Sequence, residues 1–97
     1  MQKNTIKKIQ RKINKVVNSY DKDIKQSEEN YHKIKYMFPG FAKEIDTNKQ
    51  KAIKKILFNF DNDIRFLYYL LKEKYDIETI KKVFELNNLL HIINNNQ

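Results

Sequence analysis

Residues 5–37 read TIKKIQRKINKVVNSYDKDIKQSEENYHKIKYM, and their apolar residues recur every three or four positions. The repeat has one polar member, Ser27, and runs through Ile6, Ile9, Ile13, Val16, Tyr20, Ile24, Ser27, Tyr31, Ile34 and Phe38. At about 100° per residue, all of these side chains fall on one face of an α-helix. The stretch therefore predicts one long amphipathic helix over 5–37.

The face of this helix opposite its apolar seam is basic. It carries Lys7, Lys8, Arg11, Lys15 and Lys22, and then Lys25 and Lys33. We call the first five residues the basic stripe. Such a stripe is most often the solvated side of a helix. Abundant Lys, Ile and Asn beside scarce Ala, Gly and Arg are also typical of a gene rich in A and T, so the net charge of +8 has two explanations. If the stripe has a function, it is to contact phosphate groups.

A turn separates this helix from the next. Pro39 and Gly40 interrupt the helical pattern, because proline is excluded from helix interiors and glycine tolerates positive φ. Phe38 and Phe41 flank the turn. Since two phenylalanines are unusual in an exposed loop, we expect them to fold back over the end of the bundle.

A second helix is predicted over 47–74, with an additional short helical turn fitting at 41–45. Thr47 and Gln50 have the spacing of a capping box, which places the start of the helix at 47. Its apolar seam comprises Ile53, Leu57, Phe60, Ile64, Leu67 and Leu71, and is widened by Ala52 and Leu70. This broad apolar arc is typical of a helix that contacts two neighbours.

Three aromatic residues of the second helix fall outside its apolar arc, and they share their sector with three cations. The rings are Phe58, Phe66 and Tyr69, and the cations are Lys51, Lys55 and Arg65. A large apolar side chain left in water forgoes roughly 1.5–3 kcal/mol of burial. The three rings therefore indicate cover by another helix, by a second copy of the chain, or by an external partner. Because aromatic residues and arginine are enriched at interface hot spots, these six residues are our candidate partner-binding site.

A third helix is predicted over 76–93, with Asp76 as its N-cap. Its apolar residues surround almost the whole helix, which favours a central position in the bundle or a homodimer contact through this helix. The chain is short enough for a single domain over 1–97. We therefore expect an all-α, antiparallel bundle of three main helices.

The residues needed for chemistry are absent from the sequence. There is no cysteine and only one glycine, and His32 and His91 stand apart from any partner at metal-ligand spacing. We accordingly expect no enzyme activity, no cofactor and no metal. The longest apolar run, 66–71, is far shorter than the roughly 20 residues needed to cross a bilayer. The start of the chain shows no apolar signal region, so we expect a cytoplasmic protein.

Two functions fit these features best. The first is stoichiometric binding to a protein partner through the six-residue site, as in inhibitor and immunity proteins. Small cysteine-free helical bundles occur among bacteriocin immunity proteins and phage-encoded inhibitors of host defence. This chain is similar to them in size and fold class but shares no sequence motif with them. The alternative is nucleic-acid binding through the basic stripe. Binding to an anionic membrane surface is disfavoured, because the stripe lies opposite the apolar face that the bundle itself needs.

Overall fold

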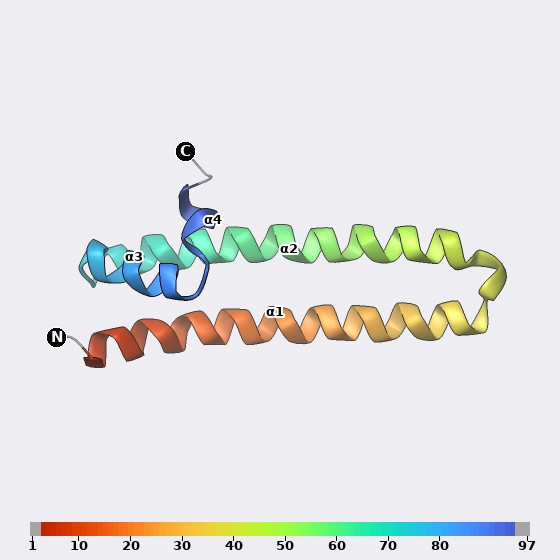
Figure 1. Cartoon of the computed structure of the whole chain (residues 1–97), viewed down its shortest axis with the longest axis horizontal. Coiled ribbons are helices and arrows are strands. Elements are labelled where there is room, and N and C mark those ends of the chain that lie inside the picture. The colour runs from red at the N-terminus through yellow and green to blue at the C-terminus, as the bar shows by residue number, and fades with distance from the viewer. Residues whose placement is uncertain (1–2, 95–97) are drawn as a thin grey trace.

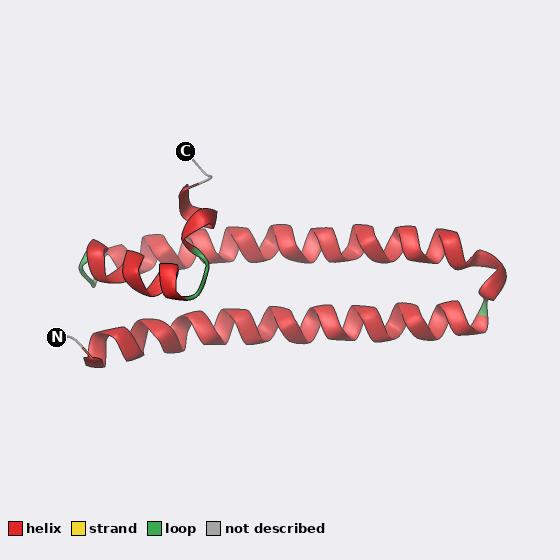
Figure 2. Cartoon of the chain, viewed as in Figure 1, coloured by secondary structure: helices red, strands yellow, loops and turns green. Residues whose placement is uncertain are grey.

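The computed structural model describes residues 3–94, and helices account for nearly all of this range (Figures 1 and 2). The elements are α1 (Lys3–Met37), the 3-10 turn η1 (Pro39–Phe41), α2 (Ala42–Lys72), α3 (Ile77–Leu86) and α4 (Leu90–Asn94). The predicted all-α class with three main helices is confirmed. α1 and α2 form a long antiparallel hairpin, and α3 packs against both of them at the end that holds the N-terminus (Figure 1). The molecule measures 58 × 28 × 18 Å.

The hydrophobic core lies at that one end of the hairpin. It consists of Ile9, Ile13, Ile64, Tyr68, Leu71, Ile80, Val83, Phe84, Leu89 and Ile92. Toward the turn, α1 and α2 pack on each other without cover from α3 or α4, and in this part of the described chain Ile45 is the one buried hydrophobic residue. Two helices cannot enclose a seam from all sides, so the seam there stays half-buried.

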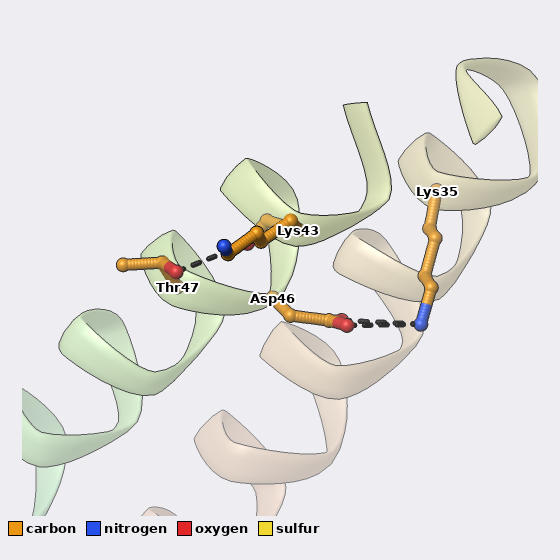
Figure 3. A network of polar contacts seen from close by, with 4 residues as sticks. All are labelled: Lys35, Lys43, Asp46 and Thr47. Atoms are coloured by element: carbon orange, nitrogen blue, oxygen red, sulfur yellow. Dashed lines mark hydrogen bonds and ion pairs between the residues drawn. The ribbon is translucent and has the colours of Figure 1, made fainter. Parts of the chain in front are cut away.

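The predicted start of the second helix at 47 was wrong. α2 begins at Ala42, immediately after η1, so the expected short turn at 41–45 is divided between η1, which ends at Phe41, and the first turn of α2. Thr47 is not a cap, because its Oγ1 donates 3.0 Å to the Lys43 carbonyl one turn earlier within the helix (Figure 3). A Thr hydroxyl at a helix interior position commonly makes this bond, so the capping-box spacing was coincidental.

The N-cap predicted for α3 is confirmed, since the Asp76 carboxylate accepts from the Thr79 backbone N–H at 3.2 Å. A single helix over 76–93 was wrong. The Leu89 N–H donates to the Phe84 carbonyl, and the Asn88 N–H donates to the Glu85 carbonyl, at 2.8 and 3.0 Å. With Asn88 at φ 58°, these bonds form a Schellman motif that ends α3. α4 then turns away, so that Leu89 packs into the core.

Two expectations about burial were also wrong. Leu57 and Leu70 were placed in the buried arc of α2, yet both are exposed. α3 and α4 cover α2 only near the N-terminal end of α1, and Leu57 lies beyond their reach. Phe38 and Phe41 do not fold back as a lid, because both rings are exposed at the hairpin end. α3 buries Ile80, Val83 and Phe84 in the core of the bundle. Ile77 and Leu86, at the two ends of α3, remain exposed.

Candidate protein-binding surface

The three aromatic residues predicted to face outward on α2 are exposed. The exposed fractions are 64% for Phe58, 63% for Phe66 and 54% for Tyr69. They follow one side of the helix from Phe58 to Tyr69, a length of about 17 Å at 1.5 Å per residue. Lys51 and Lys55 continue this side toward the hairpin turn, and both are exposed. Helical phase, read from the sequence, thus places the rings on the surface.

The Tyr69 ring is held in place by aromatic and cationic neighbours. It packs edge-on against the Tyr68 ring, with 5.9 Å between the ring centroids. Tyr68 in turn packs edge-on against the buried Phe84, with 5.6 Å between the centroids. The Lys72 ammonium lies 4.7 Å from the centre of the Tyr69 ring and 5.2 Å from that of Tyr68. These contacts favour one orientation of the Tyr69 ring, which lowers the side-chain entropy that it would lose on binding a partner.

Arg65 serves its own chain as well as the surface. It is half-buried, its Nε donates to the Ile92 carbonyl at 3.3 Å, and its Nη1 donates to the Asn62 Oδ1 at 3.0 Å. The first bond ties α4 to the side of α2. Arg65 therefore positions α4 beside the rings, and this use limits the freedom of the guanidinium to bind a partner.

The electrostatic character of this face is positive. Asp63 is turned toward α1, where its Oδ2 accepts from the Tyr20 hydroxyl at 2.5 Å. This hydrogen bond, with a smaller contribution from burial, raises the pKa of Tyr20 to about 12. Asp61 is half-buried at the edge of the face. The rings are thus accompanied by Lys51, Lys55, Arg65 and Lys72, of which the sequence reasoning missed Lys72.

The basic stripe of α1 lies fully on the surface. Lys7, Lys8, Arg11, Lys15 and Lys22 are all exposed. Within residues 3–94, the one ion pair joins Lys35 to Asp46, so none of these five cations is neutralised by a carboxylate at short range. The aromatic surface of α2 and the stripe of α1 are therefore two separate candidate sites.

A further exposed apolar group lies at the hairpin end and comprises Tyr36, Met37, Phe38 and Phe41. Sequence reasoning missed it, because it treated the two phenylalanines as cover for the bundle. The sequence carries no signal for this, because the end of the hairpin is left uncovered only by the early end of α3 at Leu86.

The described residues offer no group of histidine and acidic side chains that could hold a metal ion, and the hollows on their surface are open depressions. None of the helices in residues 3–94 combines the length and apolar content required to span a bilayer. No protein-family model, curated protein or solved structure matches the chain. Any assignment of function must therefore come from the surface itself.

Proposed function

We propose that this protein is a non-enzymatic binding module that acts stoichiometrically on a protein partner through α2. One observation carries the proposal: Phe58, Phe66 and Tyr69 are more than half exposed on one side of a regular helix. Aromatic anchors of this kind dominate the binding energy of protein interfaces. The neighbouring cations Lys51 and Lys55 would lie at the rim and favour an acidic partner surface.

The spacing of the rings indicates how the partner binds. Phe58, Phe66 and Tyr69 occupy positions i, i+8 and i+11, so they project from the same side of α2. A partner with a hydrophobic groove could receive this side of the helix, as in other complexes where an amphipathic helix lies in a groove. Complete burial of three rings would gain several kcal/mol, at roughly 1.5–3 kcal/mol for each fully buried side chain.

The inhibitor or immunity role rests on the size and shape of the chain. An elongated two-helix hairpin with a small core at one end presents surface rather than a closed pocket. Such a surface can block a partner's working face by occupying it. A role in a mobile element or phage, where small single-domain inhibitors are common, is part of the same proposal.

The test is capture of partners from host-cell lysate by tagged full-length protein, with three baits compared in parallel. The first is the wild type, the second carries Phe58→Ser, Phe66→Ser and Tyr69→Ser, and the third carries Leu86→Ser. Leu86 is a matched control, because it is an exposed apolar side chain on α3 that does not belong to the six-residue site. We expect a partner that the wild type and the Leu86 variant retain and the triple variant loses, at a one-to-one ratio when reconstituted. Equal capture by all three baits would contradict the proposal.

The basic stripe supports a second candidate function, binding to nucleic acid. Its five exposed cations would contact phosphates with little sequence preference, and the affinity would fall steeply with salt. The measurement is a gel shift with generic DNA and RNA at two salt concentrations, comparing the wild type with a variant carrying Lys8→Gln, Arg11→Gln and Lys15→Gln. Absence of binding by the wild type at low salt would eliminate this alternative.

A further inference from the structure

The hairpin end carries an apolar cluster that the proposed function does not use. Tyr36, Met37, Phe38 and Phe41 have exposed fractions between 51% and 85% and lie at the end of α1 and in the turn that joins it to α2. Figure 1 shows this turn at the end of the hairpin opposite α3. We call these four residues the tip cluster. The tip cluster lies far from the core, which occupies the opposite end of the hairpin. A compact group of exposed apolar side chains of this kind marks a contact surface.

The turn that displays the tip cluster is ordered by local bonds. The Phe41 backbone N–H donates to the Phe38 carbonyl at 3.0 Å, and Pro39 begins the 3-10 turn between them. One turn behind the rings, the Lys35 ammonium bonds both carboxylate oxygens of Asp46, at 3.0 and 3.3 Å, and thereby links α1 to α2 (Figure 3). The backbone that carries Phe38 and Phe41 therefore forms a defined turn.

The segment that carries the tip cluster bears only positive charge. From Asn30 to Lys43 the chain contains no acidic residue. Lys33 and Lys43 are exposed, one on each helix, and neither takes part in the ion pair seen among residues 3–94. The first acid after the turn, Glu44, lies in the first turn of α2, where its negative charge interacts favourably with the positive N-terminal end of the helix dipole. Apolar rings thus lie at the extreme end, and free cations lie a short distance behind them.

We propose that the hairpin end docks on an anionic lipid surface, with the tip cluster in the interfacial layer and Lys33 and Lys43 against the headgroups. Tyrosine and phenylalanine side chains partition into this layer, and lysine stems reach from it to lipid phosphates. The net charge of +8 draws the whole molecule toward such a surface. The exposed lysines Lys33 and Lys43, which form no ion pair among residues 3–94, favour an anionic lipid surface over a neutral one.

Contact with a membrane through this end leaves the core intact. The apolar seam of α1, which the bundle needs for its own packing, takes no part in it. The tip cluster is exposed beyond the core, so it can enter a lipid interface without unfolding the chain. The hairpin end is also separate from the proposed protein-binding site, because Phe41 and Phe58 are about 26 Å apart along α2.

The test is co-sedimentation of the full chain with lipid vesicles. Vesicles containing phosphatidylserine are compared with pure phosphatidylcholine, at low and physiological salt. We expect Phe38→Ser with Phe41→Ser to lower partitioning onto the anionic vesicles by at least about tenfold. Leu86→Ser, which also removes an exposed apolar side chain, should leave partitioning unchanged. Circular dichroism checks that both variants keep their helices.

A spectroscopic measurement separates insertion at the hairpin end from adsorption through the basic stripe. The chain has no tryptophan, so Phe41→Trp and Leu86→Trp each provide a single reporter. On adding anionic vesicles, we expect the emission of the Phe41→Trp variant to shift to shorter wavelength and to be quenched by brominated lipid. The emission of the Leu86→Trp variant should not change.

Three results would overturn the proposal: no sedimentation of the wild type with anionic vesicles, sedimentation that the Phe38–Phe41 double variant retains, or a tip-dependent dimer without vesicle binding. The last would identify a second copy as the occupant of the tip. The Phe58, Phe66 and Tyr69 triple variant should still bind vesicles. Failure of either proposal can therefore be recognised independently of the other.

Discussion

Replacing one buried and one exposed phenylalanine by alanine tests how the structure divides core from surface. Phe84 on α3 is 0% exposed and packs edge-on against Tyr68. Phe66 on α2 is 63% exposed. Phe84→Ala and Phe66→Ala remove the same atoms, so any difference in their effect reports the surroundings.

The structure gives the expected size of each effect. Removing a fully buried phenylalanine costs about 3–5 kcal/mol, because lost transfer energy and the cavity add together. About a third of Phe66 is buried, so its removal forfeits roughly 0.5–1 kcal/mol. Because alanine has a higher helix propensity than phenylalanine, Phe66→Ala also gains up to about 0.5 kcal/mol of stability, which offsets part of this loss. The two variants should therefore differ by at least about 2 kcal/mol.

The assay is urea unfolding followed by circular dichroism. At a slope of about 2 kcal/mol per molar, Phe84→Ala should lower the midpoint by about 2 M, whereas Phe66→Ala should lower it by less than about 0.5 M. Since a domain of this size is stable by only about 5–15 kcal/mol, the Phe84 variant should lose a large share of its free energy of unfolding. Equal losses in the two variants would refute this reasoning, because Phe66 would then be part of the core.

Three further predictions follow from local contacts. Asp76→Ala removes the N-cap of α3 and should destabilise the protein by about 1 kcal/mol, measured by thermal unfolding. Thr47→Ala, at the position that only resembled a cap, should be neutral or slightly stabilising in the same measurement, because it lies inside α2. Ultraviolet titration of the wild type against Tyr20→Phe should show one phenol that ionises near pH 12. Because an unfolded tyrosine ionises near pH 10, the stability that Tyr20 contributes should be intact below about pH 10 and should be lost as the pH rises toward 12. If Tyr20 ionised near pH 10 like an unfolded tyrosine, the result would contradict a hydrogen bond from its hydroxyl to Asp63 in solution.

Periodicity predicted α1, most of α2 and the outward direction of the α2 rings. These features depend on local phase, which is fixed at about 100° per residue wherever a helix is regular. Phe58, Phe66 and Tyr69 could therefore be placed outside the apolar arc of α2, whereas local phase left open whether another helix covers them. The Asp76 cap could be predicted for the same reason, since its partner Thr79 is three residues away.

Features that depend on tertiary contacts could not be predicted in this way. The length of α3 decides how far the third layer covers α2, and this length is set by the Schellman motif at Asn88. Two adjacent asparagines inside an apolar helical pattern did not reveal that break. Leu57 was assigned to the core because the sequence does not show that α3 ends before reaching it. Phe38 and Phe41 were assigned to a lid for the same reason.

The accessibility of the α2 rings is the central claim, and hydroxyl-radical footprinting with mass spectrometry measures it most directly. In the isolated monomer, Phe58, Phe66 and Tyr69 should be oxidised readily, whereas Phe84 should be protected. Protection of the three rings to the same degree as Phe84 would contradict the account, because the proposed protein-binding surface would then be interior.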